Sequence, residues 1–308
     1  MRNGTTNGVS RGTTNGVSRG TLLRKYAVWG WIFVTTAALL IFIMSFYPMI
    51  QAFIVSLQVG MPGNLRFAGL RNYVRIFEDD LLWRAVGNVF IYLVIQVPIM
   101  LFLALIFASV LNMKSLKAKT LFRTMLFLPC AMALFSAALI FRSFFAVDGI
   151  VNSLLTDIGI ISSPILFLTD PLWVKVVIIL IITWRWTGYN TIFYLAGMQS
   201  VDDSIYESAR IDGASSVQQF FYLTLPLLRP IILLTLIMST NGTLQLFDET
   251  FTISPGGHPS VISISQYVYN LFFRQSPQLG YASAVSYIIL IMVAILAYIQ
   301  MKVGDKKQ

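Results

Sequence analysis

The chain has 308 residues, of which 56% are hydrophobic and only 11% are charged, and its mean hydropathy is +0.74. Soluble domains carry about 25% charged residues, so this chain lacks the charge to cover a water-exposed surface of its size. The formal net charge of +9 does not indicate a nucleic-acid partner, because in a membrane protein the location of basic residues matters more than their sum.

This composition predicts an all-α integral membrane protein. Lipid offers no partners to backbone polar groups, so each crossing needs a helix of about 20 apolar residues, and the alternating pattern of a membrane β-barrel is absent from the sequence. The single cysteine, Cys130, excludes an intramolecular disulfide. Because the chain also has only one histidine, His258, no metal site is expected.

The first residues are of a different kind. The unit TTNGVSRG occurs twice, at 5–12 and again at 13–20. Gly, Thr, Asn and Ser with one Arg per unit cannot bury a core, so residues 1–25 are predicted to form a disordered basic tail.

Six apolar segments follow, each long enough to cross a bilayer as a helix. Together they predict a six-span domain at 26–302, followed by a short cytoplasmic tail at 303–308. The six segments cover approximately 28–59, 88–111, 121–145, 172–196, 228–253 and 281–301.

The basic residues set the orientation of these spans. Most of the 22 Lys and Arg residues fall on one side if the N-terminus is cytoplasmic, and the positive-inside rule favours that arrangement. Segment 146–171 holds three aspartates and no basic residue, as expected of an outer loop. The sequence therefore predicts a multi-pass protein with both termini in the cytoplasm. The basic residues on that side are Arg2, Arg11, Arg19, Arg24, Lys25, Lys114, Lys117, Lys119, Arg123, Arg210, Arg229, Lys302, Lys306 and Lys307.

A polar cytoplasmic loop at about 200–228 separates the fourth and fifth spans. Ser204 and Glu207 have the spacing of a capping box, so a helix is predicted to begin there. Gly213 is placed to end this helix in a left-handed turn, and residues 215–218 can cap a second helix.

Each of the two loop helices is predicted to turn an apolar side towards its own bundle, which leaves a polar side for a groove on a soluble partner. The alternative is an ordinary surface loop with capped helices. The predicted apolar sides comprise Ile205, Tyr206 and Ala209 in the first helix and Val217, Phe220, Phe221 and Thr224 in the second.

The fourth and fifth spans carry aromatic and polar side chains at membrane depth, where such groups usually face a cavity or a protein interface. Aromatic rings bind the C–H faces of sugars, and amides and carboxylates bind their hydroxyls. Alternatives are aromatic packing, interhelical hydrogen bonds and a structural ion pair of Arg185 with Asp248 or Glu249. The candidate pathway residues are Trp186, Tyr189, Asn190, Asn241, Thr243, Gln245, Asp248 and Glu249.

Three short motifs resemble the E-A-A…D-G-A…L-P signature of ABC importer permeases, with Ser208 in place of the middle alanine. They are Glu207-Ser208-Ala209, Asp212-Gly213-Ala214 and Leu225-Pro226. The segment 67–73 also resembles the first outer loop of the carbohydrate-type permeases for maltose, arabinose-oligosaccharides and raffinose.

The resemblance implies a type I ABC importer permease fold with six transmembrane helices. It implies that the cytoplasmic loop docks into an ATPase and carries ATP-driven motion into the spans. It also places the sugar contacts near Trp186, Tyr189 and Asn190 and, more loosely, around 243–246. The ATPase-coupling residues that it implies are Glu207, Ala209, Asp212, Gly213 and Ala214.

Its partners would be a second homologous permease, an ATP-binding-cassette ATPase dimer, an extracellular solute-binding protein and a sugar, in a bacterial cytoplasmic membrane. The chain has no Gly-x4-Gly-Lys-Ser/Thr phosphate loop, so no catalytic residue or cofactor is assigned to it, and ATP and Mg would be bound by the partner ATPase.

The predicted function is import of a sugar or oligosaccharide by alternating access. The alternatives are a secondary transporter or channel independent of an ATPase, for which no inverted repeat is visible, and a membrane enzyme, for which no catalytic cluster is visible. A glycerol-phosphate substrate would suit the same broad family, with Arg185 or Arg142 serving the phosphate.

Overall fold

The computed structural model describes residues 19–113, 115–274 and 277–305. Residues 1–18 of the predicted tail at 1–25, and residues 306–308 of the predicted tail at 303–308, lie outside the described residues. By its internal contacts the chain forms two units, residues 1–54 and residues 55–308.

The first unit is helical. Helix α1 (Arg19–Ile41) passes through one π-helical turn (Phe42–Phe46) into α2 (Tyr47–Ser56). The stretch 26–56 is long and apolar enough to cross a membrane. Helix α1 begins at Arg19, so the last residues of the predicted tail are helical.

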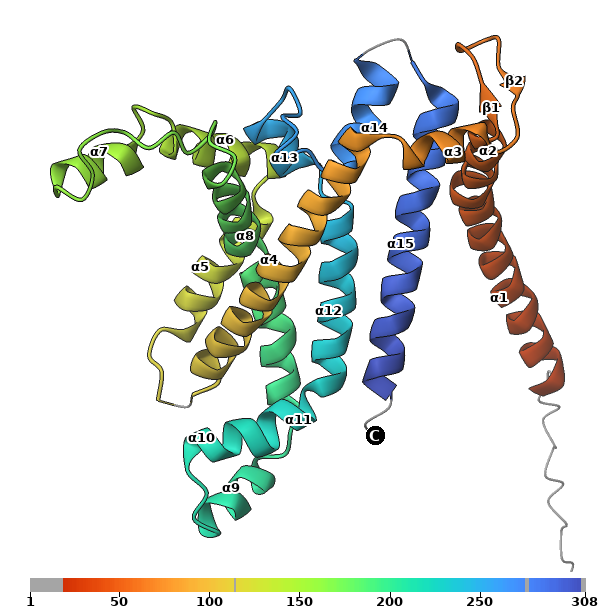
Figure 1. The fold of residues 1–308 in the computed structure, drawn as a ribbon. Helices are drawn as coiled ribbons and strands as arrows, with labels where there is room; N and C mark the ends of the chain where they lie inside the picture. Colours follow the sequence, from red (N-terminus) through yellow and green to blue (C-terminus); the bar gives the residue numbers. More distant parts are fainter. Residues whose placement is uncertain (1–18, 114, 275–276, 306–308) are drawn as a thin grey trace, which may run out of the picture. The chain divides into compact units, whose positions relative to one another are not determined.

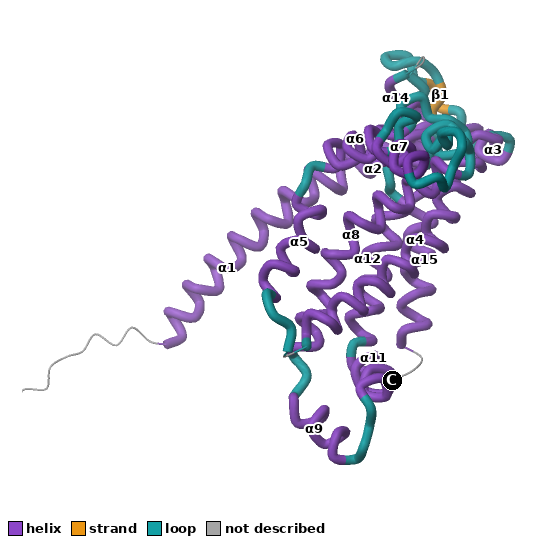
Figure 2. Tube along the Cα trace, turned by 90° about the vertical axis from the view of Figure 1, so that its left-hand side faces the viewer, coloured by secondary structure: helices purple, strands orange, loops and turns teal. Residues whose placement is uncertain are grey.

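The second unit is a bundle of long helices with shorter helices at both ends (Figures 1 and 2). Helices α4 and α8 pack along each other, α5 packs on α8, and α12 packs against α4 and α15. The long helices are α4 (Asp80–Asn112), α5 (Lys119–Ala131), α8 (Trp173–Gln199), α12 (Arg229–Leu244) and α15 (Leu279–Asp305).

The shorter elements gather at opposite ends of this bundle in both views. At one end lie the antiparallel strand pair β1 (Gln58–Val59) and β2 (Arg66–Phe67), with α3 (Arg71–Phe77), α6 (Leu134–Phe144), α7 (Ile150–Asp157), α13 (Asp248–Ile253) and α14 (Ile264–Phe273). At the other end lie α9 (Asp203–Ile211), α10 (Ser216–Gln219), a π-helical turn (Phe220–Thr224) and α11 (Leu225–Leu227).

The described residues contain five helical stretches that could cross a membrane, or six if the bent pair α5 and α6 is one span. The axes of these two helices differ by 99°. The bend falls at Met132, whose backbone is extended, so the predicted span at 121–145 is two helices rather than one. The helical structure confirms the predicted all-α membrane fold.

Two other predicted spans also differ from the structure. Helix α4 starts at Asp80, eight residues before the apolar run, because the Asp79 carboxylate accepts a hydrogen bond from the Leu82 backbone N–H at 3.0 Å and caps a polar first turn. The fifth span is interrupted at Gln245–Phe247, between α12 and α13.

Close packing of α5 on α8 depends on a glycine. A Cβ atom at Gly188 would overlap the backbone carbonyl of Leu126. Because backbone atoms cannot move aside as a side chain can, this contact requires glycine at position 188 and brings α5 close to the polar part of α8.

Hydrogen bonds that involve Asp79 and Asn72 connect the elements at the end of the bundle that holds α3 and α14. The Asp79 carboxylate accepts hydrogen bonds from the hydroxyls of Tyr267 on α14 and Tyr281 on α15. The Asn72 amide donates to the backbone carbonyls of Ser56 and Gln58, both at 2.8 Å. The motif at 67–73 therefore anchors α3 to the start of the strand pair.

Candidate functional site

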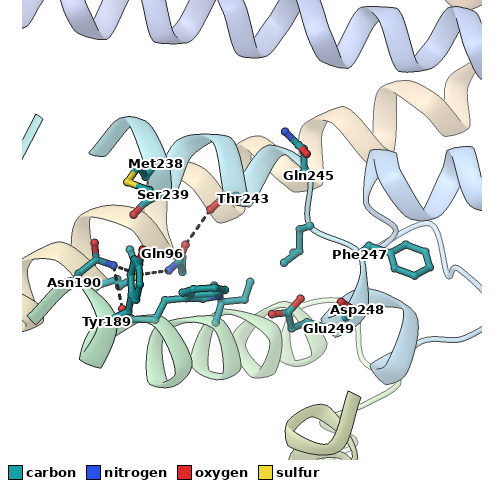
Figure 3. A pocket seen from close by; sticks show the side chains of 15 residues that line it. Gln96, Tyr189, Asn190, Met238, Ser239, Thr243, Gln245, Phe247, Asp248 and Glu249 are labelled. Carbon is teal, nitrogen blue, oxygen red and sulfur yellow. Dashed lines mark hydrogen bonds between the residues drawn. The ribbon is translucent and has the colours of Figure 1, made fainter. Parts of the chain in front are cut away.

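A cavity of about 210 Å³ lies among α4, α8, α12 and α13. Figure 3 shows polar side chains from these different helices converging on it. All but one of the predicted pathway residues line it, namely Trp186, Tyr189, Asn190, Thr243, Gln245, Asp248 and Glu249. The remaining one, Asn241, is exposed, and its side-chain oxygen accepts a hydrogen bond from the Gln245 amide at 2.6 Å.

Helix α8 supplies the aromatic wall of the cavity. Trp186, Tyr189 and Asn190 are spaced i, i+3, i+4, so they share one face of the helix. The rings of Trp186 and Tyr189 meet edge to face, with centroids 5.7 Å apart. The buried Asn190 amide donates to the Trp186 carbonyl at 3.0 Å. The Trp184 side chain does not line the cavity and packs on the ring of Phe141 instead, so it is a packing aromatic.

Helix α4 supplies a wall that the sequence pattern did not predict. The fully buried Gln96 amide donates to the Met100 sulfur at 3.1 Å, and its oxygen accepts from the Thr243 hydroxyl at 3.4 Å (Figure 3). The sequence did contain a signal for this residue, because Gln96 is a lone amide inside a long apolar run, and polar groups at membrane depth usually face a cavity or an interface. Met238, Ser239 and Gly242 on α12 also line the cavity.

The break between α12 and α13 shapes one end of the cavity. Gln245, Leu246 and Phe247 leave the helical path, and all three line the cavity. Irregular backbone at membrane depth is tolerated where it lines a cavity or is buried in protein. Asp248 and Glu249 then form the first turn of α13, where negative side chains are favourable.

The alternative of an ion pair between Arg185 and Asp248 or Glu249 is not seen among the described residues. The buried Arg185 guanidinium instead donates to the backbone carbonyls of Pro129 at 3.4 Å and Cys130 at 3.5 Å. The cause is the bend between α5 and α6, since carbonyls near the end of α5 lack helical partners and accept these bonds.

The cytoplasmic loop begins with a cap that differs from the predicted one. Asp202, not Ser204, precedes the first helical residue of α9, and its carboxylate accepts from the Ser204 backbone N–H at 2.9 Å. The capping box predicted at 204–207 was therefore wrong. Asp at this position is at least as good a cap as Ser, so the helix starts earlier.

The turn and the second cap are confirmed. Gly213 has a φ of +83°, the left-handed conformation that favours glycine. The Ser215 hydroxyl accepts from the Gln218 backbone N–H at 3.3 Å, and the Gln218 side chain accepts from the Ser215 N–H at 2.8 Å, which completes a capping box.

The predicted apolar side of the second loop helix was partly wrong. Val217 is 66% exposed and Phe221 is 56% exposed, whereas Thr224 is buried. The π-helical turn at 220–224 rotates Phe221 and Thr224 away from the positions expected for a regular α-helix, but it follows Val217 and does not explain the exposure of that residue. The predicted coupling residues Glu207, Asp212 and Gly213 are exposed, Ala209 and Ala214 are half-buried, and all except Glu207 line a surface hollow of about 310 Å³.

The fold and the site together define a class of protein: a multi-pass helical membrane protein with a polar cavity between its spans and an exposed pair of capped helices at one end. Residues 80–305 match the family described as the inner membrane component of binding-protein-dependent transport systems, and the chain belongs to this family.

Two relatives and one solved structure illustrate the likeness. The chain is 50% identical over 283 residues to the lactose transport system permease protein LacF of Rhizobium radiobacter, covering 91% of this chain and 95% of the relative. It is 31% identical over 286 residues to the arabinooligosaccharides transport system permease protein AraP of Halalkalibacterium halodurans, covering 91% and 89%.

The solved structure is that of a bacterial alginate ABC transporter in complex with an alginate pentasaccharide-bound periplasmic protein. One of its chains superposes with a TM-score of 0.80 at 22% identity, covering 93% of this chain and 96% of that one. This likeness confirms the ABC importer permease fold. The protein is the permease subunit of an ABC importer of the binding-protein-dependent kind, which favours the importer over the secondary-transporter and channel alternative.

Proposed function

We propose that this permease moves a sugar or oligosaccharide across the bacterial cytoplasmic membrane by alternating access. The observation that carries the proposal is the cavity, whose lining combines the rings of Trp186 and Tyr189 with amide and carboxyl groups from α4, α13 and the break between α12 and α13. Rings that cover C–H faces, next to groups that bond hydroxyls, suit a carbohydrate. The names of the relatives, which refer to lactose and arabinooligosaccharides, point to the same substrate class.

The partners that we propose are a second, homologous permease, an ATPase dimer that binds ATP and Mg, and an extracellular solute-binding protein. The chain itself binds no nucleotide, metal or nucleic acid in this proposal, and lipid surrounds its spans. The exposed helices α9 and α10 dock on the ATPase, with the hollow formed by Ala209, Asp212, Gly213 and Ala214 at the contact. This end of the bundle and both termini are cytoplasmic.

The test is uptake of labelled lactose or arabinotriose into proteoliposomes that hold the chain with the subunits that co-purify with it. ATP is enclosed in the vesicles, and the cognate binding protein is added outside. We expect ATP-dependent uptake. Two tryptophans on α8 provide a matched pair of variants, because Trp186 lines the cavity and Trp184 does not.

Trp186→Leu and Asn190→Ala should each lower uptake at least about fivefold, because they remove groups that would contact the sugar, whereas Trp184→Leu should retain most of it. All three variants should still co-purify with the ATPase. A cognate binding protein that binds no sugar would contradict the carbohydrate proposal. Uptake that persists without ATP would contradict the proposed coupling.

A further inference from the structure

The charged residues that line the cavity are all acidic. Asp248 and Glu249 both line it at the α13 end (Figure 3), and Glu249 is only 3% exposed. None of the described side chains that line the cavity is basic. A carboxyl group supplies no positive charge in either protonation state, so the side chains that line the cavity offer no cation to an anion.

Two arginines bond to backbone carbonyls, and one of them, Arg185, also lies over the ring of Trp186, 5.6 Å from its centroid. Arg185 donates to the carbonyls of Pro129 and Cys130, and Arg142 on α6 donates to the Thr252 carbonyl at 3.5 Å. Neither lines the cavity. Neither arginine is therefore among the side chains that a phosphate in the cavity would contact directly.

We infer that Asp248 and Glu249 restrict this permease to uncharged sugars and reject sugar acids and sugar phosphates. The inference rests on the proposed carbohydrate function and narrows its substrate class. Carboxylate oxygens accept hydrogen bonds from sugar hydroxyls, so the two side chains bind a neutral sugar. The ionised form of either side chain repels a substrate carboxylate or phosphate. At the effective dielectric constant of a protein site, one such charge at about 5 Å weakens the binding of an anion at least about tenfold.

The experiment compares two open-chain derivatives of lactose that differ in one group. Lactitol ends in a neutral hydroxymethyl group, and lactobionate ends in a carboxylate at the same carbon. Binding of each to the permease complex in nanodiscs, without the binding protein, is measured by saturation-transfer NMR, which detects weak ligands. Omitting the binding protein ensures that any selectivity belongs to the membrane complex.

We expect the wild-type complex to bind lactitol at least about tenfold more tightly than lactobionate. The double variant Asp248→Asn, Glu249→Gln keeps the shape of both side chains and removes their charge, so the preference should fall to within about threefold. The opposite change, Asn190→Asp, adds a third carboxylate to the cavity and should increase the preference. This variant also tests the inference if the double variant does not fold.

The outcomes separate the two proposals. If the wild type binds lactitol and lactobionate equally, or if neither set of substitutions changes the preference, the inference is overturned while the carbohydrate function stands. If neither lactose nor lactitol binds to the wild type, the carbohydrate function itself is contradicted.

Discussion

At the scale of single residues, the Asp79 carboxylate joins three helices. Its oxygens accept hydrogen bonds from Tyr267, from Tyr281 at 2.6 Å and from the Leu82 backbone at 3.0 Å. Burial raises the pKa of Asp79, but these hydrogen bonds and the charge of Arg75 outweigh burial and hold the pKa below its ordinary value of 3.8. Burial and the bond to Asp79 raise the pKa of Tyr267, so this tyrosine remains a donor at neutral pH.

The lowered pKa predicts how stability depends on pH. The contribution of Asp79 is fully present above the ordinary pKa of 3.8 and is lost as the pH falls through the lower pKa of the folded state. Asp79→Asn should destabilise the protein by about 1 kcal/mol at pH 7, after allowance for solvent screening, and should flatten the acid limb. Thermal unfolding in detergent between about pH 3 and 7 measures both effects. Asp80→Asn is the matched control, because the exposed Asp80 lies one residue away and should cost less.

Single residues also show where prediction from the sequence ends. The i, i+3, i+4 spacing is enough to predict that Trp186, Tyr189 and Asn190 share one helix face. Gln96 lies about ninety residues away along the chain, and only the packing of α4 on α8 brings it to the same cavity. The partners of Arg185 could not be predicted either, because they are carbonyls freed by a bend between α5 and α6.

At the scale of elements, local signals predicted the cytoplasmic loop well. The Gly213 turn and the Ser215 capping box depend on a few neighbouring residues, and both are present. The π-helical turn at 220–224 has no such local signature, so the sequence does not predict the exposure of Phe221. The breaks at Met132 and at Gln245–Phe247 fall inside runs apolar enough to be read as single spans.

Gly213 allows backbone conformation to be tested apart from steric clash. A Cβ atom there would have no neighbour within 4 Å, so only the φ of +83° opposes a side chain. Asn tolerates this conformation, whereas a β-branched residue does not. On the proposed docking role, Gly213→Val should lower uptake and transport-linked ATP hydrolysis at least about fivefold, while Gly213→Asn retains most of both. Equal activity of the two variants would show that the turn has no part in coupling.

At the scale of the whole molecule, the proposed orientation rests on the positive-inside rule applied to the whole sequence, in which most of the 22 Lys and Arg residues fall on the predicted cytoplasmic side. The end that holds α9 to α11 also holds the connection between α4 and α5, with Lys117 and Lys119 (Figure 1). The opposite end holds Arg66, Arg71 and Arg75 on β2 and α3, but its segment 146–171 has aspartates and no basic residue. Basic residues near the ends of spans favour the cytoplasm.

Two exposed serines make this orientation testable. Cys130 is the only cysteine in the sequence, so Cys130→Ser gives a background without thiols. Ser115→Cys in the α4–α5 connection and Ser163→Cys in the segment 146–171 then each introduce one exposed thiol with almost no change of shape. A membrane-impermeant maleimide should label Ser163→Cys in spheroplasts and Ser115→Cys only in inside-out vesicles. The reverse pattern would place α9 and α10 outside the cell, where no ATPase could reach them, and would remove the coupling proposal together with the orientation.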